Sequence, residues 1–309
     1  FIYECVESGW EPRAGSAQEP CWGRDLDRDG LPDSFEDELL ERFAPIVHLH
    51  PDDEFRPSSV DFYLPQVRMR YHRDIFLDHQ ALDYGEVTTA NIAHQSYDGV
   101  SSGYGTSGAD TNWFLEALHE SRGGQAPAVV PCYGHARKAP GGETGIDLQY
   151  WFFYPFNGDI TGTGGALGAE HEGDWEHVTI WVDDAGTTRL QTYMSRHRNE
   201  GEWYEDYELE ISGEQVHVYS AIDSHASYPA ADEGQRPGLP DDHTAGGGPV
   251  WNCRTAGGGT INMGELLHSF PGNEWLDYSG RWGDDLEIED TAHSPRGPAY
   301  QSRWWNDDN

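Results

Sequence analysis

The residues HEGDWEHVTIWV, at positions 171–182, decide the fold class of this chain. Their second half is β-branched or aromatic almost throughout and ends at the turn-forming run 183–186, which is typical of a strand. Segments of the same character occupy residues 148–153, 190–195 and 215–220. With 37 glycines and 18 prolines available for turns, they predict a mainly β protein. We expect an antiparallel β-sandwich with a few short helices and long loops.

Local patterns divide the chain into two parts. Residues 1–43 form an N-terminal extension that contains an acidic loop and a segment, 34–43, whose apolar residues recur at helical spacing. Residues 44–309 are expected to form one β-sandwich domain with long decorating loops. Within it, residues 85–125 are rich in Gly, Ser and Thr and predict a long loop. Residues 231–309 give few regular signals and have no assigned role, and the pair at 304–305 looks exposed.

The charge balance excludes two classes of partner. A net charge of −36 would repel the phosphates of nucleic acid and the headgroups of an anionic membrane. It favours bound cations and a neutral or cationic ligand. The sequence has no run of about 18 apolar residues, so we expect no transmembrane segment. We expect the protein to be a monomer.

The cysteines favour an oxidising compartment. Four are present, at positions 5, 21, 132 and 253, and no two form a C-x-x-C pair. Two disulfides, Cys5–Cys21 and Cys132–Cys253, are the simplest interpretation, although four cysteines allow three pairings and buried free thiols remain an alternative. The chain also starts at Phe1 without Met, as a processed protein does. We therefore expect a secreted, extracellular protein.

Residues 25–36, DLDRDGLPDSFE, have the spacing of an EF-hand-type calcium loop. Gly at the sixth position permits the sharp turn. The expected Ca²⁺ ligands are five carboxylates and one backbone carbonyl: Asp25, Asp27, Asp29, Leu31 (carbonyl), Asp33 and Glu36. A solvated acidic turn before a helix is the alternative. Because one such loop is present and no incoming helix precedes it, we interpret it as a structural clip. It resembles the calcium loops of dockerins and thrombospondin-type repeats, not those of a sensor.

A second group of metal-ligating residue types begins at His171. If the strand starts near Asp174, alternation places Asp174 and Glu176 on one face and Trp175 and His177 on the other. His171 lies on the preceding Gly-rich loop and could fold back toward the two carboxylates. Such a mixed N/O set suits Ca²⁺, Mg²⁺, Mn²⁺ or Zn²⁺. His225 and Asp159 are available as further ligands. The alternative is a polar strand edge with satisfied hydrogen bonds.

Three motif-bearing stretches follow one another between residues 40 and 230: APIVHLHP at 44–51 with PSSVD at 57–61, residues 149–157 leading into 171–182, and VYS at 218–220 with SHASYP at 224–229. In order and wording they resemble the family named after the yeast vacuolar protein-sorting protein sixty-two. Many members of that family are secreted microbial proteins without an assigned reaction.

The central motif is also similar to the G-H-R-H-D-W-E signature of the necrosis-inducing protein family. Those proteins are secreted β-sandwich cytolysins that hold a divalent cation and bind plant sphingolipid sugar headgroups. The resemblance implies five metal ligands: Asp159, His171, Asp174, Glu176 and His225. Two departures weaken it. Residues 172–173 replace the Arg-His of the signature, and a Gly-rich insertion separates Asp159 from the motif.

These observations give one leading function and two alternatives. The first is a secreted, divalent-metal-dependent hydrolase that acts on an extracellular carbohydrate or phosphoester-bearing polymer. A metal-bound water would be the nucleophile. Glu202 or His177 would transfer the proton, and Asp174 is the third expected catalytic residue. The second is a non-catalytic, metal-dependent binder of a glycan or glycolipid headgroup, either cytolysin-like or lectin-like. In a binder, aromatic residues at 203–204 would stack on sugar rings. The third is a purely structural metal site. For residues 196–204, the alternative without a functional role is a hairpin turn with Trp203 in the core.

Overall fold

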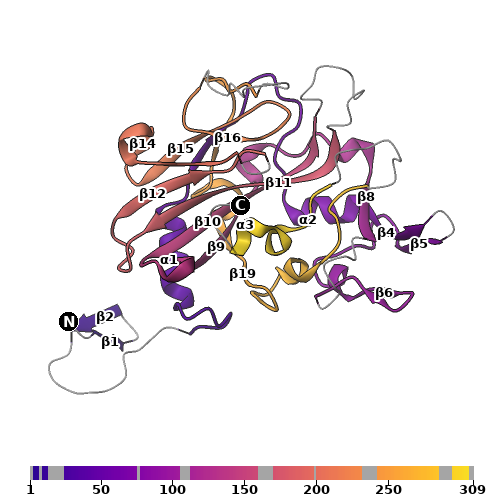
Figure 1. Cartoon of the computed structure of the whole chain (residues 1–309), viewed down its shortest axis with the longest axis horizontal. Coiled ribbons are helices and arrows are strands. Elements are labelled where there is room, and N and C mark those ends of the chain that lie inside the picture. Colours follow the sequence, from indigo (N-terminus) through magenta and orange to yellow (C-terminus); the bar gives the residue numbers. More distant parts are fainter. Residues whose placement is uncertain are drawn as a thin grey trace.

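The computed structural model describes residues 3–6, 9–12, 24–74, 77–104, 112–158, 170–197, 200–231, 242–284 and 294–305. Two β-sheets lie face to face at its centre, and further segments cover the outer face of the larger sheet (Figure 1). The mainly β fold class predicted from the sequence is therefore confirmed.

The larger sheet has six strands and is built around the longest hairpin of the described chain. Its strands, in spatial order, are β13 (Glu202–Tyr204), β12 (Arg189–Met194), β11 (His171–Val182), β10 (Ile146–Asn157), β9 (Cys132–Lys138) and β18 (Thr260–Asn262). Strands β10 and β11 pair antiparallel over their whole length, with Tyr154 opposite Asp174 and Phe152 opposite Glu176. Strand β18 runs parallel to β9.

The smaller sheet has five strands and closes the sandwich. Its strands are β14 (Ile211–Ser212), β15 (Gln215–Ser220), β3 (Ile46–His48), β17 (Val250–Asn252) and β16 (Ser227–Tyr228), the last paired with β15. Strands β15 and β3 are parallel. The sandwich therefore departs from the purely antiparallel expectation at two pairings. The parallel pairing brings the loops that follow β3 and β15 to the same end of the sheet.

The core between the sheets comes from the alternation of β10 and β11. The even-numbered positions, such as Phe152 and Ile180, face the smaller sheet and meet Val47, Val218 and Trp251. Helix α1 (Asp33–Arg42) packs Leu39 and Leu40 into this same core. Its apolar residues recur three and four positions apart, which places them on one helical face. The N-terminal extension thus shares a core with the sandwich that follows it.

The outer face of the larger sheet is covered as well, which the sequence did not suggest. Trp151, Phe153 and Trp175 on that face pack against residues of the C-terminal segment: Trp275, Trp282 and Trp304. Trp304, expected to be exposed, is fully buried, whereas Trp305 is half exposed. Tryptophan supplies a large apolar area without needing a regular element. This explains how a Gly- and Asp-rich segment with few strands can cover a sheet.

The remaining elements are short. A three-stranded sheet contains β5 (Leu77–Leu82), β4 (Val67–Asp74) and β8 (Trp113–Ala117), and three hairpins pair β1 (Tyr3–Val6) with β2 (Gly9–Pro12), β6 (Ser96–Tyr97) with β7 (Val100–Ser101), and β19 (Gly264–Glu265) with β20 (His268–Ser269). The other helices are α2 (Val60–Tyr63), α3 (Ser302–Trp305) and 3-10 turns at Leu64–Gln66, Ile92–His94, His119–Ser121, Pro127–Val129, Pro140–Gly142, Asp206–Glu208, Ala256–Gly258, Glu274–Asp277 and Pro298–Tyr300.

Several local expectations can now be compared with the structure. The predicted helix at 34–43 and strand at 215–220 coincide with α1 and β15 to within one residue. The expectation of a loop across 85–125 was wrong, since β6, β7 and β8 lie within it. Strands β6 and β7 have only two residues each, and β8 is a short apolar run within a region otherwise rich in Gly, Ser and Thr.

The structure also bears on the cysteines and on membrane insertion. Cys132 and Cys253, which are 121 residues apart and fully buried, form a disulfide with a Cα–Cα distance of 5.3 Å. The predicted Cys5–Cys21 pair lies outside the residues whose side chains are described. Among the described helices, none has the length and apolar character needed to cross a bilayer.

Candidate functional site

The first half of β11 carries acidic residues into the end of the sandwich. Asp174 and Glu176 share the inner face with the core residue Val178, while Trp175 and His177 face the outer layer, as the alternation predicted. Gly173 has a φ of 62°, and a Cβ at this position would lie 2.2 Å from the carbonyl oxygen of Trp282. Only glycine therefore lets this part of β11 approach the C-terminal segment.

His225 lies against these carboxylates from the loop that follows β15. Its Nδ1 is 2.9 Å from Oδ2 of Asp174, and its ring stacks on Tyr154 at a centroid distance of 3.7 Å. Burial disfavours the charged ring, but the hydrogen bond to Asp174 and the charges of Asp53 and Glu176 outweigh it. The pKa of His225 is therefore raised above its usual value. Its Nε2 has no hydrogen-bond partner, although the residue is 1% exposed.

Asp53 is a member of the cluster that the sequence did not reveal. It lies in the loop after β3, and its Oδ2 is 3.6 Å from Nε2 of His225. Its other oxygen accepts a hydrogen bond from the backbone N–H of Phe55 at 2.9 Å. The residue is 3% exposed. It reaches the cluster because β3 and β15 are parallel neighbours, a pairing that no local pattern indicates.

Glu176 is held by residues from two other segments. The hydroxyl of Ser195 donates to Oε2 of Glu176, and Nη1 of Arg303 donates to that hydroxyl at 2.6 Å. Nη1 of Arg303 also lies 4.0 Å from Oε2 of Glu176. Burial, and next the charge of Asp174, raise the pKa of Glu176 to about 7. Arg303 comes from α3, so the C-terminal helix forms part of this site.

We call Asp53, Asp174, Glu176 and His225 the acidic–histidine cluster. The other two ligands predicted for this site, His171 and Asp159, are not part of the cluster as the structure describes it. His171 begins β11, half-buried, and its Nδ1 lies 3.1 Å from the carbonyl oxygen of Gly173. Asp159 lies outside the described residues.

The two proposed proton-transfer residues are not directed at the cluster. Glu202 is exposed on β13, and its Oε2 accepts hydrogen bonds from Arg196 at 3.1 Å and from the hydroxyl of Tyr204 at 2.8 Å. His177 faces the outer layer, stacked on Trp151 at 4.6 Å. Burial, followed by the charges of nearby arginines, lowers the pKa of His177 well below its usual value, so its ring is held neutral.

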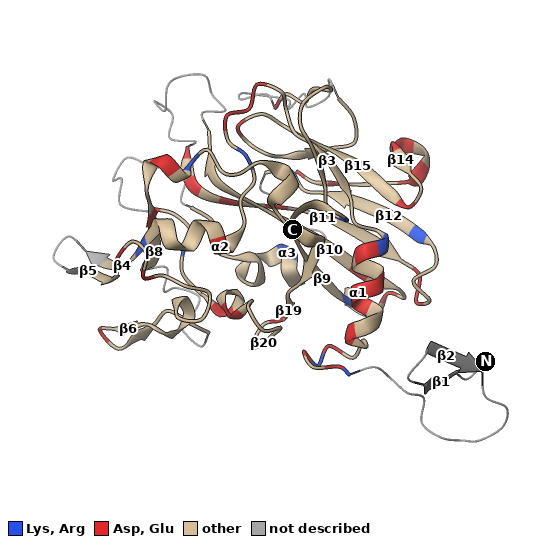
Figure 2. Ribbon diagram, turned by 180° about the vertical axis from the view of Figure 1, so that it is seen from behind, with Lys and Arg blue, Asp and Glu red and all other residues tan. Residues whose placement is uncertain are grey.

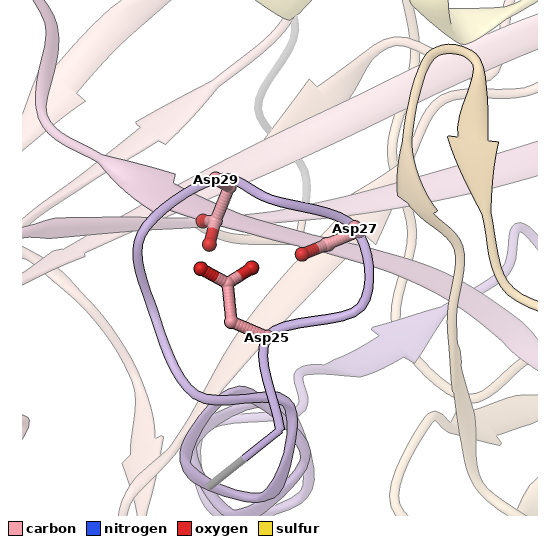
Figure 3. A group of neighbouring side chains, drawn as sticks. All are labelled: Asp25, Asp27 and Asp29. Atoms are coloured by element: carbon pink, nitrogen blue, oxygen red, sulfur yellow. The ribbon is translucent and has the colours of Figure 1, made fainter. Parts of the chain in front are cut away.

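The residues predicted to form a calcium loop lie just before α1 and in its first turn. Figure 2 shows acidic residues in red along this loop and the first turn of the helix. Figure 3 shows the carboxylates of Asp25, Asp27 and Asp29 turned toward the inside of the loop. Their oxygens lie within 4.8 Å of one another, and so do those of Asp27, Asp33 and Glu36. Among the described residues, His, Cys, Asp or Glu ligand atoms come this close in groups of three only in this loop.

Burial changes the protonation of the loop carboxylates. Desolvation, and next the charge of Asp29, raise the pKa of Asp27 to about 7, and desolvation raises that of Glu36 to about 9. Leu31, expected to offer its carbonyl, is buried, and its N–H donates to Oδ1 of Asp29 at 2.6 Å. The loop therefore encloses carboxylates that cannot all be ionised without a compensating cation.

The fold and these two acidic sites define a β-sandwich protein with a carboxylate–histidine cluster at one end. Residues 122–293 match the family model described as vacuolar protein sorting-associated protein 62. The chain belongs to this family.

Two curated relatives come from Saccharomyces cerevisiae. Vacuolar protein sorting-associated protein 62 is 24% identical over 85% of this chain and 67% of its own length. Vacuolar protein sorting-associated protein TDA6 is 23% identical over 84% of this chain and 62% of its own length. This chain thus spans about two thirds of the relatives that it matches.

Two solved structures are similar to parts of the fold. One is Necrosis and Ethylene inducing Protein 2 from the causal agent of cocoa's witches' broom disease, with 14% identity, 62% of this chain and 67% of that chain covered, and a TM-score of 0.31. The other is NLPPya in complex with mannosamine, with 12% identity, 92% and 91% covered, and a TM-score of 0.39.

Proposed function

We propose that the protein is a divalent-cation-dependent binder of a hydroxyl-rich ligand, such as a glycan headgroup, with the acidic–histidine cluster as its binding site. The observation that carries the proposal is the contact of two buried carboxylates, from Asp53 and Asp174, with the imidazole of His225, while the buried carboxylate of Glu176 lies two residues further along β11. The carboxylates come from two parts of the chain, the loop after β3 and strand β11, and the imidazole comes from a third. Cores avoid such groups unless a counter-charge satisfies them.

The charge count of the cluster leaves room for a cation. Arg303 lies 4.0 Å from Glu176 and supplies one positive charge. His225, even when protonated, supplies one more for three carboxylates. Carboxylate oxygens and an imidazole nitrogen with no hydrogen-bond partner are suitable ligands for a divalent ion. A cation bound there would coordinate hydroxyl oxygens of the glycan directly. The net charge of −36 favours a neutral or cationic ligand.

A metal-dependent hydrolase is the second candidate, and one observation favours it. Asp174 holds Nδ1 of His225 and leaves Nε2 without a hydrogen-bond partner. This is the arrangement in which a carboxylate orients a histidine for proton transfer. Against it, the exposed carboxylate of Glu202 is already engaged by Arg196 and Tyr204. We therefore favour binding without turnover.

The test is binding of the full chain to an array of neutral hexoses and hexosamines, with Ca²⁺, Mn²⁺ or EDTA. We expect binding that EDTA abolishes and that Asp53→Asn and Asp174→Asn weaken at least about tenfold, as loss of a charged metal ligand does. Asp52→Asn, an exposed neighbour with the same charge change, is the matched control. Binding unaffected by EDTA would contradict the proposal. Release of reducing sugar that His225→Asn abolishes while binding persists would favour the hydrolase.

A further inference from the structure

The loop that precedes α1 contains buried carboxylate oxygens without a hydrogen-bond donor. Oδ1 of Asp27 and Oε1 of Glu36 are in this state, although the residues are 2% and 0% exposed. Oδ2 of Asp29 is a third such atom. Unsatisfied buried acceptors of this kind are rare in folded proteins because water can no longer solvate them. Three of them in one loop indicate a missing positive group.

We propose that residues 25–36 bind a Ca²⁺ ion, and that this ion fastens α1 to strand β18 of the C-terminal part of the chain. Two sets of carboxylates surround the position, and Asp27 belongs to both. An ion held there would contact oxygens from the loop and from the first turn of the helix together.

The backbone of the loop is shaped for this enclosure. Arg28 and Gly30 have φ values of 70° and 90°, which turn the chain back on itself. Oδ1 of Asp33 accepts the N–H of Leu26 at 2.8 Å and closes the loop. At Gly30 a Cβ would lie 2.9 Å from Nζ of Lys138. Its positive φ would strain any other residue, whereas the end of the Lys138 side chain could move aside.

The link to the C-terminal part runs through Glu36. Its Oε2 accepts a hydrogen bond from Nδ2 of Asn262 at 2.9 Å, while Oε1 has no partner. Asn262 ends β18, and its carbonyl accepts Nδ2 of Asn273 at 2.9 Å. A cation on Oε1 would fix the Glu36 carboxylate between the loop and β18. Ion binding should therefore order both segments, which are more than 220 residues apart (226 between Glu36 and Asn262).

The donor set favours Ca²⁺ over other ions. All the proposed side-chain ligands are carboxylate oxygens, which suit a hard cation. Ca²⁺ accepts six to eight oxygens in flexible geometry, whereas Mg²⁺ demands a tight octahedron. We therefore expect Ca²⁺ to act at lower concentration than Mg²⁺.

The experiment compares thermal unfolding of the full chain in EDTA, Ca²⁺ and Mg²⁺ for the wild type, Glu36→Gln and Asp27→Asn. The matched control is Glu38→Gln, an exposed residue on the same helix with the same charge change. Ca²⁺ should raise the Tm of the wild type and of the control by more than that of the two loop variants, in which only an ion at the acidic–histidine cluster can respond. In EDTA, the Tm of Glu36→Gln should equal or exceed that of the wild type, because the variant removes a buried carboxylate that has no counter-charge.

Hydrogen exchange provides the second measurement. Ca²⁺ should slow amide exchange in both 33–42 and 260–265 of the wild type, and in neither segment of Glu36→Gln. The proposal is overturned if Ca²⁺ leaves the Tm of the wild type unchanged, if Glu36→Gln responds to Ca²⁺ as the wild type does, or if protection is confined to 33–42. Sugar binding by Glu36→Gln is measured in parallel, so that failure of this site and failure of the acidic–histidine cluster are separate results.

Discussion

Nδ1 of His225 lies 2.9 Å from Oδ2 of Asp174, although the two residues are 51 positions apart. Both are almost completely buried, and His225 adopts a left-handed backbone conformation with a φ of 55°. A bulky residue rarely adopts this conformation, and asparagine tolerates it better than most. The strained backbone and the buried pair together indicate that the loop after β15 is held in place by this contact.

His225→Asn should therefore remove the imidazole without adding backbone strain. We expect it to lower the free energy of unfolding by about 3 kcal/mol, since it leaves the Asp174 carboxylate buried without its partner. Urea unfolding monitored by tryptophan fluorescence measures this. Asp52→Asn should be neutral, and an unchanged midpoint for His225→Asn would show that the pair contributes nothing to stability.

Arg303 should connect the C-terminal helix to the cluster. Arg303→Gln removes the donor to Ser195 and the charge near Glu176, so we expect a loss of about 1–3 kcal/mol in the free energy of unfolding. Glu176→Gln should cost less stability in the Arg303→Gln background than in the wild type. In that background the Glu176 carboxylate has already lost its counter-charge, so replacing it with a neutral amide removes less. A double-mutant cycle measures this coupling, and strictly additive losses would contradict it.

Asp242 gives a prediction for pH. Burial alone would raise its pKa, but hydrogen bonds and charge from His197, Tyr228 and Ser224 outweigh burial and hold the pKa of Asp242 below its usual value. A carboxylate with a lowered folded-state pKa stabilises the fold above its unfolded pKa of about 3.9, and this stability is lost as the pH falls through the folded value.

Asp242→Asn should accordingly be less stable than the wild type at pH 7, and the difference should shrink as the pH falls below 4. Urea unfolding between pH 7 and pH 3 measures the two profiles. Parallel profiles, with a difference that does not depend on pH, would mean that the charge of Asp242 plays no part.

The disulfide between Cys132 and Cys253 joins β9 to the segment after β17. Its 121-residue separation closes a long loop, so its removal should lower the free energy of unfolding by about 4 kcal/mol. The double variant Cys132→Ala/Cys253→Ala measures this without a reductant. A loss below about 1 kcal/mol would show that removing the cross-link adds little conformational entropy to the unfolded chain.

The sequence predicted those features that depend on local periodicity. Alternation in β11 placed Asp174 and Glu176 on one face and Trp175 on the other, because a strand has a period of two residues. Helix α1 was predicted from apolar residues that recur three and four positions apart, which is the spacing of one helical face. The spacing of the loop at 25–36 also predicted the carboxylates that the structure brings together.

Features that depend on contacts between distant segments could not be predicted. Asp53 and Arg303 reach the acidic–histidine cluster from opposite ends of the chain, and no periodic signal links them to β11. Trp282 and Trp304 lie in a Gly-rich segment whose regular elements are few and short, so their burial was not evident. Such contacts follow from the pairing of β3 with β15 and from the packing of the C-terminal segment on the sheet.

Metal content measured by native mass spectrometry distinguishes an ion at the 25–36 loop from an ion at the acidic–histidine cluster. The full chain is equilibrated with Ca²⁺ or Mn²⁺ and compared with Glu36→Gln and Asp53→Asn/Asp174→Asn. We expect two ions per wild-type chain and one in each variant, with sugar binding retained by Glu36→Gln and lost by Asp53→Asn/Asp174→Asn. A Glu36→Gln chain that holds no ion and still binds sugar would contradict a cation at the acidic–histidine cluster.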